Sequence, residues 1–218
     1  MDLRPSALQA RFGAAARVLD AYAGQAADDE PGRPGAALNG YLRWAAITDP
    51  IAASVAAEQL RYLAARLVDE PAAVPPAVAA ALPRKPDGGL ADGQWLETVA
   101  VLLDEAVDHG FPPPGPPATH WEWNRRFPAL AQFLGCYFTQ DFRDEFSDHD
   151  EAIAAWLRTA SAVDRARLAG EIDEVLAFEL VDNDLDEALV MLGMDVDPPL
   201  PPTAWLRGTK QTIRRPSA

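Results

Sequence analysis

The side chains of this chain that could do chemistry are mainly carboxylates. Among 218 residues there are 33 Asp and Glu, but one Cys and three His. The sequence contains no G-x-S-x-G elbow, no Walker loop, no G-x-G-x-x-G and no H-E-x-x-H, and it offers little for a transition-metal site. We therefore expect no catalytic residues, no cofactor and no metal. An acid–base enzyme stays open, because paired carboxylates on different helices leave no local motif.

Two single residues each have two interpretations. Cys136 lies in the apolar stretch 127–139 and no spacing pairs it with a base, so we expect a thiol packed in the core rather than a nucleophile. His149 lies between Asp148 and Asp150, whose carboxylates would raise its pKa and allow a pH switch. An exposed histidine in the first turn of a helix gives the same pattern, and we favour it.

The segment 182–186, Asp-Asn-Asp-Leu-Asp, begins like a calcium-binding loop. Such a loop needs glycine at its sixth position and a bidentate glutamate at its twelfth. Those positions hold Glu187 and Gly193 here, so the pattern fails. Acids at the start of a helix, where the helix dipole favours negative charge, explain the same residues.

The carboxylates gather in two runs. Residues 141–151 hold six acids and one Arg, and residues 171–187 hold eight acids and no base. Between residues 119 and 206 there are 6 basic and 18 acidic residues, whereas the last twelve residues carry 4 basic and none acidic. A charged run is usually a solvated face. Two runs in one small module can also add into a negative field that speeds encounter with a cationic partner.

The overall charge excludes several classes of function. With 19 Lys and Arg the net charge is −14, and an acidic surface repels nucleic acid. No run reaches the ~18 apolar residues that a membrane span needs. The start, Met1 to Pro5, resembles no signal peptide, and a single cysteine cannot form an internal disulfide. We expect a cytoplasmic protein that binds neither nucleic acid nor membrane.

The elements that must position these acids are helices. The chain has 42 Ala, the best helix former, against 26 Val, Ile and Thr together. We therefore predict an all-α fold of helical bundles. Phe111-Pro-Pro-Pro-Gly-Pro-Pro117 can be neither helix nor central strand, and it predicts a linker between two helical modules, 1–111 and 119–218. A long ordered loop within one domain is the alternative.

Residues 120–207 resemble a known family. Phe127 to Phe142, FPALAQFLGCYFTQDF, is followed by an acidic loop and by DEAIAAWL, and later by Leu192-Gly193, Asp197-Pro198 and Trp205-Leu206. This order is similar to that in the immunity proteins of contact-dependent growth inhibition systems. Phe142 departs from the tryptophan that the family often has there, but it keeps an aromatic ring. Residues 1–111 resemble no family that we recognise.

The resemblance implies a small helical protein that binds the toxin domain delivered by a competing sister cell. Many such toxins are nucleases, and a nuclease needs a basic surface for its phosphate substrate, which an acidic inhibitor would cover. The leading hypothesis is a cytoplasmic immunity protein that neutralises a cognate, basic toxin by stoichiometric binding. The alternative is a helical interaction or regulatory module unrelated to toxins. In a variant of the first hypothesis, residues 1–111 are a second immunity module against another toxin.

Site residues follow from charge and expected exposure, since the resemblance assigns no binding roles. Leu134, Gly135, Tyr137 and Phe138 are expected to build the fold, with Gly135 allowing close helix approach. Gln140 and Asp141 either cap the end of helix 127–139 or face the partner. The predicted partner-binding carboxylates are Asp141, Asp144, Glu145, Asp148, Asp150, Glu151, Glu171, Glu174, Asp182 and Asp184.

Overall fold

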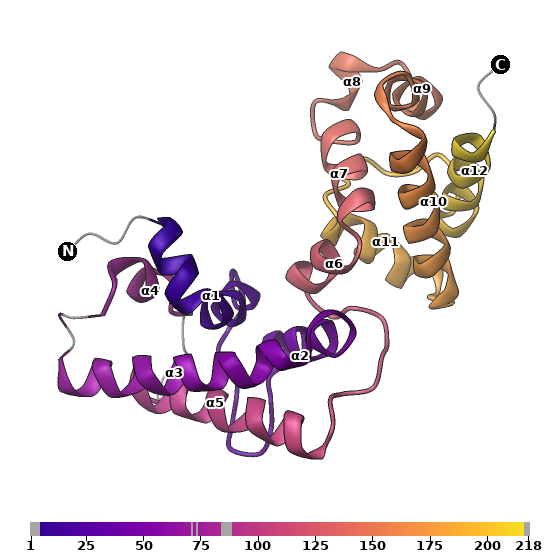
Figure 1. The fold of residues 1–218 in the computed structure, drawn as a ribbon. Helices are drawn as coiled ribbons and strands as arrows, with labels where there is room; N and C mark the ends of the chain where they lie inside the picture. The colour runs from indigo at the N-terminus through magenta and orange to yellow at the C-terminus, as the bar shows by residue number, and fades with distance from the viewer. Residues whose placement is uncertain (1–4, 71, 73, 84–88, 216–218) are drawn as a thin grey trace. The chain divides into compact units, whose positions relative to one another are not determined.

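The fold is all-α, as the composition predicts. The computed structural model describes residues 5–70, 72, 74–83 and 89–215, and within them it has twelve helices and no β-strand (Figure 1). The chain divides into two compact units, one ending at Glu122 and one beginning at Trp123. The division falls inside a helix, further along the chain than the proline segment 111–117.

The first unit is built from five helices and the start of a sixth. They are α1 (Pro5–Ala21), α2 (Ala36–Thr48), α3 (Ile51–Asp69), α4 (Pro76–Ala81), α5 (Asp92–His109) and α6 (His120–Arg126). Helices α3 and α5 run side by side along their length (Figure 1). The buried face of α3 carries alanines, among them Ala53, Ala56 and Ala57, and such small side chains let helix backbones approach closely.

A buried carboxylate in α6 ties the proline segment to the first unit. Glu122 has a fully buried side chain, and Arg43 of α2 donates to its two oxygens at 2.8 and 2.7 Å. The amide of Ala118 donates to the same carboxylate at 3.0 Å. A Cβ at position 40 would lie 3.2 Å from the Glu122 Oε2 atom, so Gly40 gives the carboxylate its room. The chain after the prolines is therefore packed onto the first unit up to Glu122.

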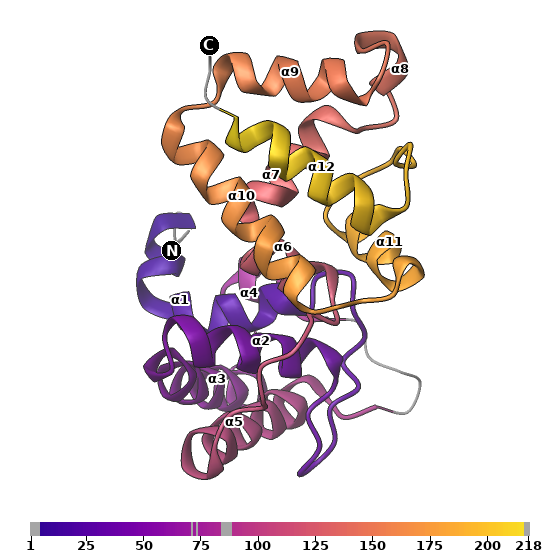
Figure 2. The ribbon, with the colours of Figure 1, turned by 90° about the vertical axis from the view of Figure 1, so that its right-hand side faces the viewer.

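The second unit continues α6 and adds six helices. They are α7 (Pro128–Tyr137), α8 (Phe142–Glu145), α9 (His149–Thr159), α10 (Ala162–Ala177), α11 (Asp182–Met191) and α12 (Pro202–Arg214). Figure 2 shows α12 running beside α10. The two tryptophans after the prolines are both core residues, Trp121 in the cluster of the first unit and Trp123 in that of the second.

The motif residues of α7 build the fold of the second unit. Leu134 and Phe138 are fully buried. The close approach depends on Gly193 rather than on Gly135. A Cβ on Gly193, which has a φ of +94°, would lie 3.2 Å from the Gly135 Cα, whereas a Cβ on Gly135 would lie 4.0 Å from the Gly193 carbonyl oxygen, an ordinary contact distance. Beside this contact the amide of Asp195 donates to the Phe138 carbonyl at 2.8 Å. The chain after α11 is thus held against the end of α7.

His149 is not the exposed histidine that the sequence suggests. Its ring lies 4.9 Å from that of Phe142, 5.3 Å from Phe138 and 6.0 Å from Trp205, measured between ring centroids. Its Nε2 atom is buried and has no hydrogen-bond partner within the described part of the chain. Burial lowers the pKa of His149, and this outweighs the opposing effect of the two flanking aspartates. The pKa shift is therefore opposite to the one that a carboxylate-driven switch requires.

Removing the buried carboxylate of α6 should destabilise the first unit. Glu122→Ala leaves the Arg43 guanidinium, whose side chain is 15% exposed, without its partner. We expect a loss of about 3 kcal/mol or more in the free energy of unfolding, measured by urea titration. The matched control is Glu30→Ala, which breaks an exposed pair with Arg33 and should cost less than about 0.5 kcal/mol. Equal losses in the two variants would contradict a buried, tightly paired Glu122.

The stability of the second unit should fall on acidification. The unfolded chain binds a proton at His149 more readily than the folded chain, because the folded pKa is lowered from 6.5. The contribution of this histidine is therefore complete above pH 6.5 and is lost as the pH falls through that value. Calorimetry between pH 7.5 and 5.5 measures this slope. In His149→Phe the slope should be shallower, whereas His109→Phe, on an exposed residue of the first unit, should keep it.

Candidate functional site

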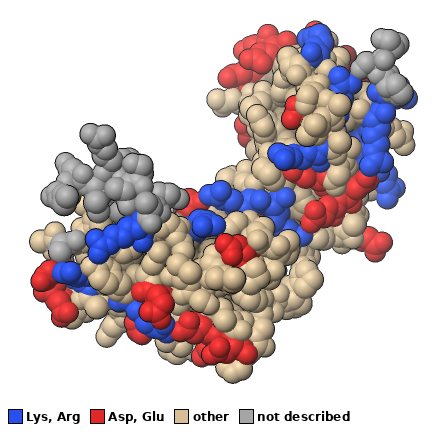
Figure 3. All heavy atoms as spheres, in the orientation of Figure 1, with Lys and Arg blue, Asp and Glu red and all other residues tan. Residues whose placement is uncertain are grey.

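Four carboxylates of the first acidic run project from the second unit without partners. The exposed acids are Asp141 just before α8, Asp144 and Glu145 on α8, and Asp150 in the first turn of α9. Within the described residues none of their side chains makes a hydrogen bond or an ion pair. Figure 3 shows acidic side chains gathered at the α8 end of this unit. These four residues form the exposed acidic face.

Two other acids of this run shape its backbone. Asp148 is the N-cap of α9 and its Oδ1 accepts from the Glu151 amide at 2.9 Å. Glu151 in turn accepts from the amide and hydroxyl of Ser147, at 2.8 and 2.7 Å, and these bonds lower the pKa of Glu151. Both side chains are exposed, but their oxygens are engaged in holding the start of α9.

Aromatic side chains fix the exposed acidic face from below. Phe142 is buried, and its ring stacks on Phe138 with 5.7 Å between centroids. Phe146 is half-buried and stacks on Tyr137 at 6.0 Å. Since these two phenylalanines point inward from the ends of α8, residues 143–145 between them face solvent. The acids are therefore presented on an anchored turn.

Half of the acids in the second run help to hold the unit together. Glu171 of α10 is half-buried, and its Oε2 accepts from the Leu130 amide at 2.8 Å, at the start of α7. Burial raises the pKa of Glu171, against the opposing effect of the amides of Leu130 and Ala129. Asp182 accepts from the Thr203 hydroxyl at 2.8 Å, at the start of α12. These carboxylates cap the N-termini of helices other than their own.

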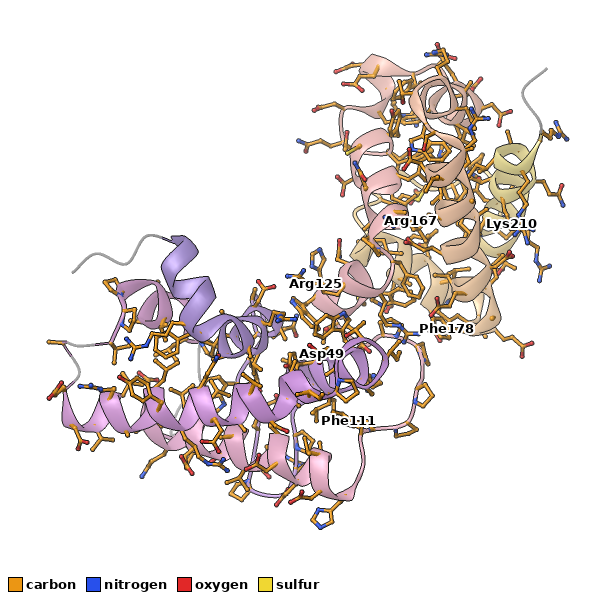
Figure 4. All side chains as sticks on the ribbon, viewed as in Figure 1. Asp49, Phe111, Arg125, Arg167, Phe178 and Lys210 are labelled. Atoms are coloured by element: carbon orange, nitrogen blue, oxygen red, sulfur yellow. The ribbon has the colours of Figure 1, made fainter. Side chains whose placement is uncertain are left out.

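Bases from distant parts of the sequence neutralise further acids of α10. Glu174 pairs with Arg126 of α6 at 2.8 Å. Asp173 accepts from Lys210 and from Arg214 of α12, the latter at 2.6 Å, and these cations lower the pKa of Asp173. Figure 4 labels Lys210 on α12. Of the predicted site residues in this run, only Asp184 is exposed without a side-chain partner within the described residues.

The two acidic runs are therefore not equivalent. The sequence shows no base inside 171–187, but α12 supplies Lys210 and Arg214 to Asp173. The cluster of bases in the last twelve residues is the sequence feature that could have predicted this pairing. The run 141–151 holds one base, Arg143, against its six acids. Its exposed face is one part of the unit where negative charge stays unbalanced. The other is formed by Glu179, Asp184, Asp186 and Glu187 of the second run, whose side chains have no partner within the described residues.

Cys136 and Gln140 both have exposed side chains. The expectation of a core thiol at Cys136 is wrong, because this side chain is exposed on the outer face of α7. Gln140 makes no side-chain hydrogen bond within the described residues, and the end of α7 is instead closed by the amides of Phe138 and Asp195. Asp141 likewise makes no capping bond with its side chain.

The described residues offer neither a metal site nor a membrane span. No group of three or more His, Cys, Asp or Glu side chains in this part of the chain is arranged to hold a metal ion. None of the helices that the structure describes combines the length and apolar character needed to cross a bilayer.

Comparisons with known proteins concern the second unit. Residues 126–213 match the family model described as CdiI immunity protein. A chain in the crystal structure of the CdiA-CT/CdiI complex from Y. kristensenii 33638 is 32% identical, and the alignment covers 42% of this chain and 97% of that chain with a TM-score of 0.41. No curated protein sequence matches this chain.

The matched segment begins in α6 and ends in α12, and it includes α8 with the exposed acidic face. The resemblance on the motif residues of α7 and the family match agree on the same part of the chain. Through its residues 126–213, this chain belongs to the CdiI immunity protein family.

Proposed function

We propose that this chain is an immunity protein that binds a cognate toxin domain and neutralises it by stoichiometric association, without chemistry of its own. The observation that carries the proposal is the family match over the unit that presents the exposed acidic face. The similar solved chain comes from a complex of CdiA-CT with CdiI, which supports a CdiA-CT-type toxin domain as the partner. The site of action is the cytoplasm, where the toxin reaches its target.

A basic nuclease is the toxin class that fits the charge. A nuclease must present cationic groups to phosphates, and the exposed acidic face offers Asp141, Asp144, Glu145 and Asp150, which form no ion pair within the described residues. An inhibitor of this kind competes with nucleic acid for the same surface. Asp148 and Glu151 support this face by holding the start of α9, so we assign them a positioning role.

The basic test is a binding and protection assay. The toxin domain encoded beside this chain is mixed with the purified protein, and the complex is measured by calorimetry and size-exclusion chromatography. Co-expression should restore growth to cells that produce the toxin. Absence of a complex at micromolar concentrations would reject the immunity function and favour a regulatory or scaffold module.

Neutralising the acidic face should slow association. The variant Asp141→Asn/Asp144→Asn/Glu145→Gln removes three exposed charges, and we expect the association rate constant at low salt to fall by about tenfold. The dissociation rate constant should change less, and the difference from the unmodified protein should shrink in high salt. Stopped-flow fluorescence at several ionic strengths measures both.

The matched control removes the same number of charges from the first unit. Asp69→Asn/Glu105→Gln/Asp108→Asn alters three exposed acids that have no partner within the described residues. Association should then stay close to that of the unmodified protein. If both triple variants slow association equally, overall charge is responsible rather than the acidic face.

We also propose that the second unit carries toxin binding by itself. A fragment of residues 119–218 should bind the toxin within about threefold of the full chain, and residues 1–111 should not bind it. The fragment 1–111 lacks Trp121 and Glu122, which belong to the core and the buried ion pair of the first unit, so 1–126 is the better-folded control. Loss of binding in a folded 119–218 fragment would show that the first unit takes part.

A further inference from the structure

A second feature of the family-matching unit lies on the outer face of α7. The ends of α7 and α9 and the start of α10 enclose a hollow of about 390 Å³. Figure 4 labels Arg167, one of its lining residues, on the face where α7 and α10 lie side by side. The remaining lining residues are Pro128, Ala129, Gln132, Cys136, Tyr137, Trp156, Thr159, Ala160 and Asp164.

The aromatic walls of the hollow are held in place by the core. The rings of Tyr137 and Trp156 lie 6.1 and 5.4 Å from that of Phe133, measured between centroids, and Phe133 is 1% exposed. Both wall residues are themselves half-buried. An incoming group thus meets surfaces whose side-chain conformations are already fixed, which lowers the entropy cost of binding.

The polar groups of the hollow are uncommitted. Within the described residues the side chains of Gln132, Tyr137, Trp156 and Arg167 make no hydrogen bond or ion pair. Neither the Tyr137 hydroxyl nor the Trp156 indole nitrogen is among the buried polar atoms that lack a partner, so both reach the surface. The Trp156 indole and the Arg167 guanidinium are only hydrogen-bond donors, and the guanidinium carries a full positive charge, whereas Gln132 and Tyr137 can donate or accept.

The carboxylates nearest to Arg167 along α10 attract its charge but make their hydrogen bonds with other groups. Asp164 accepts from the amide and hydroxyl of Ser161, at 3.0 and 2.7 Å. Glu171 accepts from the Leu130 amide. The guanidinium therefore has five donors available for a group outside the chain, and it suits a carboxylate or carbonyl oxygen.

The hollow adjoins the exposed acidic face. Tyr137 forms one wall of the hollow, and its other neighbour is Phe146, stacked at 6.0 Å and 25°. Phe146 directly follows Glu145 in the acidic run. Tyr137 therefore links the wall of the hollow, through Phe146, to the end of the acidic run.

We propose that this hollow is an anchor site for a toxin side chain that has an apolar stem and ends in a carboxylate or carbonyl oxygen, with Arg167 as its counter-ion. This proposal rests on the proposed function. The stem packs between Tyr137 and Trp156, and the terminal oxygen accepts from Arg167 and Gln132. The toxin surface then needs basic groups opposite the acidic face and an acceptor beside them.

Cys136 provides a native reporter for this site. It is the single cysteine of the chain, it is exposed, and it lines the hollow. The rate of its reaction with a maleimide is measured in the free protein and with a saturating amount of the toxin domain encoded beside this chain, after that domain is freed of cysteine. We expect complex formation to slow the reaction by about tenfold or more.

The outcomes separate the two proposals. A complex that elutes as one species while Cys136 reacts at the free rate would overturn the anchor site and leave the immunity function standing. If no complex forms, both proposals fall together. Protection of Cys136 in the complex supports both.

Two variants test the chemistry of the site. Arg167→Glu should weaken toxin binding by about 30-fold, because it replaces the counter-ion with a repelling charge. The control Arg207→Glu makes the same charge change at an exposed position of α12, outside the hollow, and should have little effect. Gln132→Glu, on an exposed residue, places a repelling carboxylate in the hollow without altering the core and should also weaken binding. Binding by Arg167→Glu and Gln132→Glu equal to that of Arg207→Glu would overturn the anchor site.

Discussion

The buried ring of Phe138 is the contact on which the acidic face depends. Phe138 directly follows α7, and its ring meets Phe133 of α7, Phe142 of α8, His149 of α9 and Trp205 of α12, all within 5.2 to 5.7 Å between centroids. Four helices therefore converge on one side chain. Because Phe142 and His149 are drawn inward, the polar residues between them have no place in the core and must face solvent.

This arrangement divides the carboxylates of the unit into two kinds. Glu171, Glu174 and Asp182 receive bonds from other helices, and Asp148 and Glu151 shape the turn before α9. The oxygens of these carboxylates are engaged in bonds within the molecule. The other kind, on α8 and the start of α9, rests on aromatic rings and keeps its oxygens free for solvent or a partner. A high density of acids in the sequence is thus a poor measure of the field that a partner meets, since pairing decides it.

Local patterns in the sequence predict the helices but not the contacts between helices. The spacing of Phe127, Leu130 and Leu134 correctly marks the buried stripe of α7. The need for glycine at position 193 was not predictable, because its close contact with Gly135 exists only once the chain after α11 returns to α7. The prediction for His149 is wrong for the same reason, since the rings around it come from three separate parts of the chain. The bases that neutralise α10 come from α6 and α12, and no local pattern links them.

Charge alone is a weak basis for choosing one toxin among many basic proteins. An acidic face attracts every cationic surface, and its effect is mainly on the rate of encounter. A neighbouring donor-lined hollow changes this, because a wrong partner that presents a lysine to Arg167 meets repulsion, and one that presents nothing leaves the site unfilled. Specificity needs such a feature that penalises the wrong partner as well as one that attracts the right one. The two features together therefore account for discrimination better than the acids do by themselves, and the stacked pair Tyr137 and Phe146 fixes the spacing between them.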